Sequence, residues 1–181
     1  MVYYSDGKIT VRDLEERDPE IFAAAEREQG WQEDGSKLRK RLSDAASGRA
    51  VCLAADFCGE PAGYVCVYPK YEHGAFAGRM PMIVDFAVLE KFRRRGVGGK
   101  LMDVAEDIAR RFSDEVGLGV GLHPGYGSAQ RLYAKRGYVP DGSGVWYRDK
   151  VCGEYESCRN DDDLVIYLSK KLGGRGDPPQ G

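Results

Sequence analysis

The chain of 181 residues is long enough for one ordinary domain and too short for two comfortable ones. Its 27 Lys and Arg nearly balance its 29 Asp and Glu, and the formal net charge of −2 gives no strong field toward nucleic acid or an anionic membrane. The sequence contains no run of about 18 apolar residues, so it predicts no membrane-spanning helix. The start, MVYYSDGKI, lacks the basic and apolar regions of a secretory signal. We therefore expect a soluble cytoplasmic protein without nucleic-acid or membrane partners.

Cysteine usage predicts free thiols and no metal site. None of the five cysteines pairs with another as CxxC, and their spacing does not match a zinc ribbon. Cys52 and Cys66 lie in apolar runs, where a thiol behaves as a small hydrophobic group. Nothing in the pattern resembles the disulfide framework of a small secreted domain.

In the first half of the chain, the periodicity of apolar residues predicts a strand, two helices and a β-hairpin. The hairpin is indicated by the turn residues CGEP between two apolar runs. The expected elements are a strand over 8–14, a helix with Asp18 as N-cap and Pro19 as first residue, a helix from about Ser36, and strands over 50–57 and 62–68.

The middle of the chain predicts a buried strand, a long helix and a second interior strand. Residues 80–89 are nearly all apolar, as in a strand buried on both faces, and Asp85 is the one charged residue among them. A helix is expected from Gly98, with an apolar face that ends at Phe112. The strand over 116–122 contains three glycines, which would admit a ligand or a neighbouring backbone.

The last third predicts a short helix over 128–136, stopped by Gly137, and two strands over 144–150 and 164–168. We expect a single domain over residues 1–172 and a disordered tail over 173–181. The alternation of elements predicts an α/β (α+β) fold in which a mixed sheet has helices on both faces.

The most informative segment joins the buried strand to the long helix. It contains RRRGVGGK, and its glycines allow a tight turn with close backbone approach to a ligand. A new helix leaves about four N–H donors free at its positive dipole end, so the segment predicts an anion site suited to a pyrophosphate. A nucleotide P-loop is excluded because Leu101 follows Gly99-Lys100 where Ser or Thr is needed. A GxGxxG dinucleotide turn is excluded because the same leucine stands where its third glycine belongs.

The remaining pattern, [QR]xxGx[GA], fits residues 93–98. The stretch VLEKFRRRGVGGKLM resembles the pyrophosphate-binding turn of the GNAT superfamily of acyl-CoA-dependent N-acetyltransferases. About 30 residues later, SAQRLYAKRGY (Ser128–Tyr138) resembles the second motif of that family, AxxLYxKxGF. The resemblance covers roughly 82–138 and implies a mostly antiparallel central sheet, with acetyl-CoA as co-substrate and no metal.

The resemblance also implies which residues hold the donor. Backbone N–H groups from Arg95 to Lys100 would bind the pyrophosphate, and the backbone of Val88 would hold the pantetheine arm and polarise the thioester carbonyl. The expected donor-binding residues are Val88, Arg93, Arg94, Arg95, Gly96, Val97, Gly98, Gly99 and Lys100.

For the chemistry, the resemblance implies that Tyr133 protonates the departing thiolate. The alternative is that Tyr133 is a core aromatic. The general base stays open between Asp85, as a desolvated carboxylate of raised pKa, His123 at the end of a strand, and ordered water. Two departures from the family pattern bear on this: Tyr126 stands where many members have asparagine, and Gly121 where some have glutamate.

These features predict direct acetyl transfer from acetyl-CoA to an amine, with a small molecule as first choice of acceptor. A protein α-amine or lysine, and a non-catalytic acyl-CoA sensor, stay as alternatives, and so does a homodimer. Carboxylates over 154–163 could steer a cationic amine or form a solvated turn. Four aromatic residues could line an acceptor cleft: Trp31, Tyr126, Trp146 and Tyr147.

Overall fold

The computed structural model describes residues 1–31 and 34–173. Contacts divide the chain into two compact units: the first contains Met1–Pro69 and Ile83–Arg111, and the second contains Lys70–Met82 and the chain from Phe112 onward. The single domain expected over 1–172 stays a prediction. The expected tail lies outside the described residues, apart from Gly173.

The first unit is built on strands in the order β1-β2-β3-β4-β5. Pairs β1/β2, β2/β3 and β3/β4 are antiparallel. The hairpin between β3 and β4 turns on Cys58 and Gly59, whose φ angles of 50° and 84° match the two left-handed positions of a type I′ turn. The strands are β1 (Val2–Ser5), β2 (Ile9–Asp13), β3 (Val51–Phe57), β4 (Glu60–Tyr68) and β5 (Met82–Val88).

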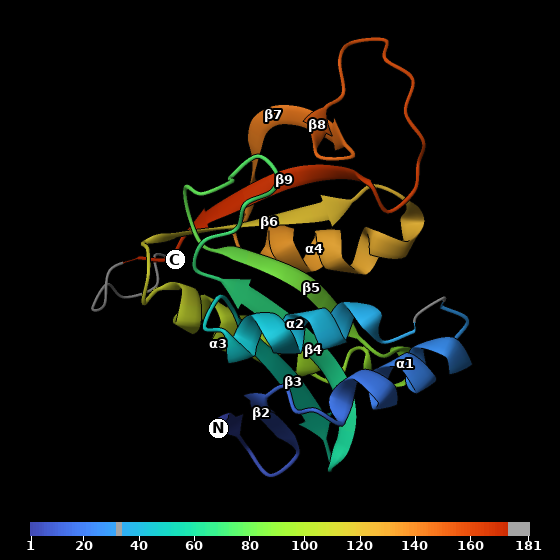
Figure 1. The fold of residues 1–181 in the computed structure, drawn as a ribbon, viewed down its shortest axis with the longest axis vertical. Coiled ribbons are helices and arrows are strands. Elements are labelled where there is room, and N and C mark those ends of the chain that lie inside the picture. Colours follow the sequence, from blue (N-terminus) through green and yellow to red (C-terminus); the bar gives the residue numbers. More distant parts are fainter. Residues whose placement is uncertain (32–33, 174–181) are drawn as a thin grey trace. The chain divides into compact units, whose positions relative to one another are not determined.

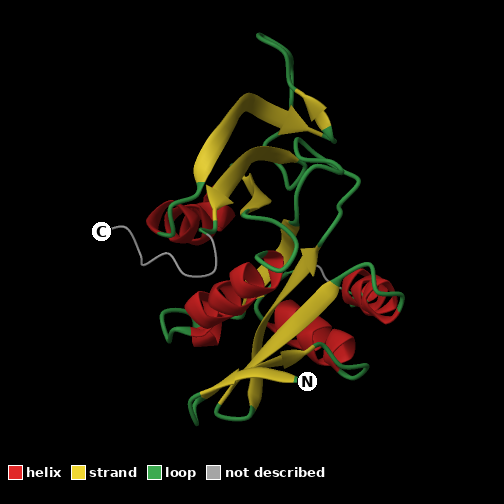
Figure 2. Ribbon diagram, turned by 90° about the vertical axis from the view of Figure 1, so that its left-hand side faces the viewer, coloured by secondary structure: helices red, strands yellow, loops and turns green. Residues whose placement is uncertain are grey.

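Three helices cover these strands on both sides (Figures 1 and 2). They are α1 (Asp18–Glu28), α2 (Ser36–Ala46) and α3 (Val97–Ala109). Each buries an apolar stripe, represented by Phe22, Leu38 and Leu101, none more than 2% exposed. This burial provides most of the stability of helices that are too short to persist alone in water.

A buried arginine joins two strands and a helix of the first unit. Arg12 on β2 is 7% exposed and holds the fully buried Asp18 with both terminal nitrogens, at 2.7 and 3.0 Å. It also bonds Asp56 on β3 through Nε at 2.9 Å and Nη2 at 3.1 Å. Loss of one partner from such a buried, hydrogen-bonded group typically costs about 3–5 kcal/mol, because it leaves an uncompensated charge.

The second unit holds four strands in the order β6-β9-β7-β8, with antiparallel pairing throughout. These are β6 (Glu115–Gly121), β7 (Val139–Tyr147), β8 (Lys150–Val151) and β9 (Leu164–Lys171), with helix α4 (Gly127–Lys135) between β6 and β7. The chain reverses after α4 at Gly137, with a φ of 85°, as the sequence predicts.

The glycines of β6 make room for aromatic rings. A Cβ on Gly117 would lie 2.4 Å from Cδ2 of Phe76, and a Cβ on Gly121 would lie 2.3 Å from the ring of Tyr126. Real Cβ atoms essentially never approach so closely, so a larger residue at either position would force the ring beside it to move. The sequence predicts that these glycines admit a ligand or a neighbouring backbone, whereas in the structure they accommodate aromatic side chains.

The structure differs from the sequence expectations at several points, and the strand expected over 144–150 is divided between β7 and β8 by a turn at Arg148 and Asp149. Asp18 is the first residue of α1 rather than its N-cap, because its carboxylate binds Arg12 and the Glu15 amide. Phe112 lies beyond the end of α3 and is 53% exposed, so it is not part of the apolar face. Strand β1 was not predicted, since its four residues are half polar and only partly buried. Within the described residues, no helix is long and apolar enough to cross a membrane.

Candidate functional site

The turn predicted to bind an anion connects β5 to α3. After Val88 the chain makes one 3₁₀ turn, η1 (Glu90–Phe92), and runs through three arginines into Gly96. Positive φ angles occur at Arg94, 59°, and Gly96, 87°. Any L side chain at Gly96 would be strained, so this glycine is needed for the chain to enter α3.

The N-terminus of α3 offers backbone donors that no described residue accepts from. The first bond into this helix runs from the Lys100 N–H to the Gly96 carbonyl, at 3.1 Å. The N–H groups of Val97, Gly98 and Gly99 precede that bond and have no acceptor inside the helix. Beside Gly99, an added Cβ would meet nothing within 4 Å, so the backbone there is approachable. Convergent N–H groups at the positive end of a 13-residue helix are suited to a phosphate.

The four cations of the turn are used differently. Arg93 is bound locally, to Glu90 at 3.3 Å and to the Val88 carbonyl at 3.4 Å. Lys100 lies 3.7 Å from Asp103, and Arg95 lies over the ring of Phe57 at 5.4 Å. Arg94 is exposed and has no ion-pair or hydrogen-bond partner in the described part of the chain. It is therefore the cation most available to an anionic ligand.

Two residues that no motif indicated position this turn. The Gln29 side chain, at the end of α1, accepts a hydrogen bond from the Glu90 N–H at 2.9 Å and so fixes the start of η1. Gly63 on β4 allows the end of β5 to approach, because a Cβ there would lie 2.5 Å from the Ala87 carbonyl oxygen. Gln29 carries no sequence signal, and Gly63 is one of 24 glycines in the chain.

Asp85 is strained and paired. It has a φ of 52° within β5, an uncommon conformation for a residue other than glycine. Its Oδ2 accepts a hydrogen bond from Nε of Arg41 on α2, and Arg41 also donates to the Tyr68 hydroxyl at 2.8 Å. Tyr68 in turn donates to Asp44 at 2.5 Å. The sequence predicts that Asp85 is a desolvated carboxylate among apolar residues, whereas in the structure it is paired with the Arg41 guanidinium.

This charge network perturbs two of its members strongly. The hydrogen bond from Tyr68 and the cations Arg49 and Lys40 hold the pKa of Asp44 far below its usual value. Burial and the bond to Asp44 raise the pKa of Tyr68 well above that of a free phenol. Near neutral pH the Tyr68 phenol is therefore protonated and donates to the ionised Asp44. Tyr68 in turn accepts from Arg41, which also donates to Asp85.

His123 is used at both ring nitrogens. It precedes a short 3₁₀ turn, and its Nδ1 accepts from the Gly125 N–H at 3.1 Å. Its Nε2 lies 2.9 Å from Asp162, which also accepts from the Tyr126 hydroxyl at 2.9 Å. A neutral imidazole has one lone pair, and these contacts place it at Nδ1, where the Gly125 amide occupies it. Taking up an amine proton would require His123 to give up this bond.

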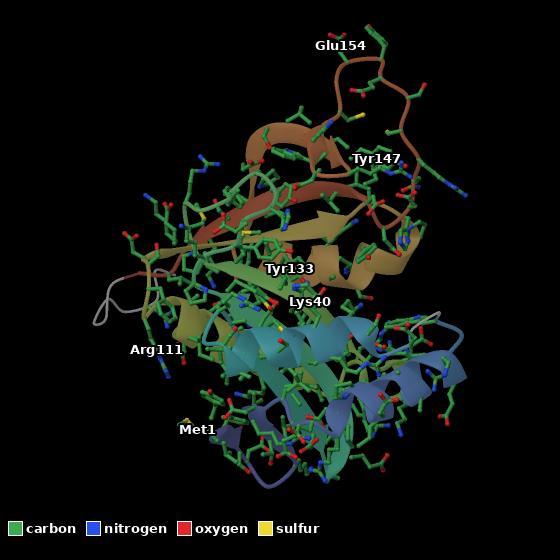
Figure 3. The ribbon with its side chains drawn as sticks, in the orientation of Figure 1. Met1, Lys40, Arg111, Tyr133, Tyr147 and Glu154 are labelled. Atoms are coloured by element: carbon green, nitrogen blue, oxygen red, sulfur yellow. The ribbon has the colours of Figure 1, made fainter. Side chains whose placement is uncertain are left out.

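Tyr133 lies on α4 (Figure 3) and is 4% exposed. Burial raises the pKa of its hydroxyl well above the usual value, and the nearby Tyr126 phenol adds to the effect. The hydroxyl is therefore protonated throughout the neutral range. The ring also lies 5.8 Å from that of Tyr138, so Tyr133 is both a core aromatic and a potential proton donor.

The predicted site residues divide between the two units. Val88, Asp85 and the whole turn belong to the first, and Tyr133 and His123 belong to the second. Of the four candidate aromatic residues, Trp31 lies in the first unit beside Arg93, at 5.8 Å from ring to guanidinium. The other three are in the second unit, where Trp146 is bonded to Ser143 and Tyr147 to Asp161.

Most carboxylates over 154–163 are engaged within the second unit. Asp162 binds His123, Asp163 lies 3.6 Å from Arg148, and Glu156 accepts from the Gly153 amide. Glu154 is exposed and has no partner among the described residues. No three His, Cys, Asp or Glu side chains in the described ranges are grouped so as to hold a metal ion.

Comparison with known proteins identifies the class. The sequence matches the Acetyltransferase (GNAT) family over residues 10–138, so the chain belongs to that family. The family uses acetyl-CoA, and the unused amides, the glycines and the free Arg94 described above fit its pyrophosphate. No curated protein matches the chain.

Solved structures confirm the predicted fold class. A putative GNAT acetyltransferase from Desulfovibrio desulfuricans superimposes with a TM-score of 0.67 at 14% identity, over 91% of this chain and 99% of that one. The ribosomal-protein-S18-alanine N-acetyltransferase from Escherichia coli gives 0.64 at 15% identity, over 96% and 99%. YncA, a putative acetyltransferase from Salmonella typhimurium crystallised with acetyl-CoA, gives 0.64 at 15% identity, over 95% and 98%.

The turn makes a testable prediction for donor binding. Gly98→Asp places a negative charge at the free amides of α3, and we expect the Kd for CoA to rise by about tenfold or more, roughly 1.4 kcal/mol. Isothermal titration calorimetry with CoA measures this directly. Ala24→Asp adds the same charge on the exposed face of α1 and should leave the Kd within about twofold. Unchanged affinity in folded Gly98→Asp would refute the assignment.

A second prediction concerns pH and the Asp44 network. Because the pKa of Asp44 is lower in the folded state than the unfolded value of about 4, its charge stabilises the fold above that pH and the effect is lost as pH falls. Asp44→Asn should cost about 1–3 kcal/mol at pH 7 and progressively less below about pH 4. The free energy of unfolding in urea, measured for both proteins at pH 7 and below pH 4, tests this, and the exposed Asp107→Asn serves as the control. A cost independent of pH would contradict it.

Proposed function

We propose that the protein is an N-acetyltransferase that moves an acetyl group from acetyl-CoA directly to an amine, with a small molecule as the first candidate acceptor. The observation that carries the proposal is the run of unused N–H groups at the start of α3, behind a strand whose last residue is Val88. Membership of the acetyltransferase family supplies the acyl chemistry.

Donor binding falls to the backbone and cations of the turn. The amides of Val97, Gly98 and Gly99 would hold the pyrophosphate, with Arg94 as the free counter-charge. Bound acetyl-CoA supplies an activated thioester. In this proposal the backbone of Val88 orients that group, and the close packing of β5 on Gly63 keeps the strand end in place.

Deprotonation of the amine has one better-placed candidate on this chain. Asp85 uses Oδ2 for Arg41, while its Oδ1 has no hydrogen-bond partner among the described residues. His123 has its lone pair committed to Gly125. We therefore place Asp85 ahead of His123 as acceptor of the ammonium proton, directly or through water. Its pairing with Arg41 uses one carboxylate oxygen and leaves the other to bind the cationic amine.

Tyr133 is the proposed hydrogen-bond donor to the leaving thiolate. A thiol of pKa near 8.5 is more acidic than a phenol whose pKa is raised by burial, so complete proton transfer to a free thiolate is uphill. The useful role is donation while the carbon–sulfur bond breaks and negative charge grows on sulfur. Such a donor supplies charge stabilisation that water would otherwise have to provide.

Two acceptor classes are supported by different observations. The exposed carboxylate of Glu154 favours a small cationic amine. A protein α-amine is the second candidate, because proteins of the same fold include the ribosomal-protein-S18-alanine enzyme and RimL, a ribosomal L7/L12 α-N-protein acetyltransferase.

Thiol release from acetyl-CoA over a panel of acceptors tests the function. The panel contains small diamines, amino sugars, peptides with free α-amines and lysine peptides with blocked ends, each with its N-acetylated form as the matched blank. Turnover of small amines supports the proposal, and turnover of peptides alone moves it to the second candidate. CoA binding without turnover of any acceptor would overturn it in favour of a sensor.

The mechanism predicts a specific defect for Tyr133→Phe. This change keeps the ring and removes the hydroxyl, so kcat should fall on the order of 10²-fold while the Kd for CoA stays the same. Tyr138→Phe makes the same change in a neighbouring tyrosine that is equally buried, only 3% exposed. This control should leave kcat within a few-fold. Equal losses in the two variants, or full kcat in Tyr133→Phe, would assign Tyr133 to the core alone.

A further inference from the structure

Two cysteines lie near each other in an exposed loop of the second unit. The loop follows β8, extends away from the β7–β8 hairpin and returns to β9, with Glu154 labelled near its outer end (Figures 1 and 3). Cys152 comes directly after β8, and Cys158 follows six positions later. Neither residue has a part in the acetyl-transfer mechanism proposed above.

A hydrogen-bonded turn folds the segment between them back on itself. The Glu156 N–H donates to the Gly153 carbonyl at 3.0 Å, and the Gly153 N–H donates to the Glu156 carboxylate at 2.7 Å. Tyr155 takes the left-handed position of this turn, with a φ of 62°. The Cys152 thiol lies 3.8 Å from the Glu156 carbonyl, and its backbone N–H is anchored to Val145 at 2.7 Å.

The turn brings the Cys158 side chain close to that of Cys152. Desolvation and the neighbouring Cys158 thiol raise the pKa of the Cys152 thiol. Both sulfurs are free thiols in the structure. Cys158 is exposed and Cys152 is half-buried, so a reagent in solution reaches Cys158 first.

The other facing pair in the chain lacks this access. Cys52 and Cys66 are directly opposite on β3 and β4, but they are 3% and 0% exposed. A buried thiol reacts slowly because the thiolate is disfavoured and the oxidant is excluded. The chain therefore contains its own comparison between two close thiol pairs that differ in exposure.

We propose that Cys152 and Cys158 form a reversible intramolecular disulfide and that this loop is a thiol redox site. The oxidant is a low-molecular-weight disulfide such as glutathione disulfide. The Cys158 thiolate attacks one of its sulfur atoms, forms a mixed disulfide and releases one glutathione thiolate. The Cys152 thiolate then attacks the Cys158 sulfur and releases the second glutathione. Two protein thiols lose two electrons, glutathione disulfide gains them, and the two protons end on two glutathione thiols.

The surroundings of Cys158 suit the first step. Its neighbour Arg159 is exposed and has no ion-pair partner in the described ranges, so its charge is available to an anionic oxidant. Ring closure joins two side chains that already interact across the folded-back turn. The second attack is therefore intramolecular, with a high effective concentration of the resolving thiol.

The test uses the full chain in glutathione buffers that run from reducing to oxidising. Samples are blocked with N-ethylmaleimide, digested without reductant and analysed by mass spectrometry. We expect the peptides containing Cys152 and Cys158 to appear joined, with loss of two hydrogen atoms, in the oxidising buffers and separate after dithiothreitol. Cys52 and Cys66 should remain thiols under the same conditions.

Single variants separate this reaction from random oxidation. Cys152→Ser should leave a stable glutathione adduct on Cys158, because the resolving thiol is missing, whereas Cys58→Ser should behave as the unchanged chain does. Circular dichroism verifies that each variant is folded. The proposal is refuted if both loop cysteines are alkylated in every buffer, or if they occur only as separate glutathione adducts or links between chains. These readouts do not depend on acetyl transfer, so failure of the proposed function would not affect them.

Discussion

The first unit depends on the hydrogen-bonded ion pairs that the buried Arg12 makes with two carboxylates. Its guanidinium satisfies Asp18 and Asp56 together, so the start of α1 is fixed against β2 and β3. The far end of the same helix carries Gln29, whose amide oxygen holds the Glu90 N–H at the entrance to the glycine turn. A polar contact in the core is thereby linked through one rigid helix to the loop that presents the free amides of α3.

Glycines in this chain serve two separate purposes. Gly96 supplies a backbone angle that the entry into α3 requires, and it would do so even in open space. Gly63, Gly117 and Gly121 are needed because another part of the chain occupies the volume of a side chain. Only the first kind is visible as a motif, since a turn has a fixed spacing, whereas a steric requirement depends on what the fold brings opposite.

Much of the fold and of the donor site could be predicted from the sequence, because both depend on local patterns. The apolar run before RRRGVGGK and the helical period after it determine a strand, a turn and a helix. The state of Asp85 could not be predicted, since Arg41 is 44 positions away and reaches it only after α2 has packed on the sheet. The hydrogen bonds of His123 could not be predicted either. They depend on Asp162, far along the chain, and on the Gly125 amide of a short 3₁₀ turn that no periodicity predicts.

The route of the chain through the two units constrains how the protein can fold during synthesis. The first unit is interrupted by residues 70–82, which belong to the second, and is complete only when Arg111 has been made. The interrupting segment contains Phe76, whose ring fills the space beside Gly117, a residue synthesised 41 positions later. Until β6 arrives, this aromatic side chain has no native place to pack. A nascent chain that has emerged from the ribosome only as far as residue 111 would therefore hold the whole first unit and an exposed apolar segment of the second, the kind of surface that chaperones bind.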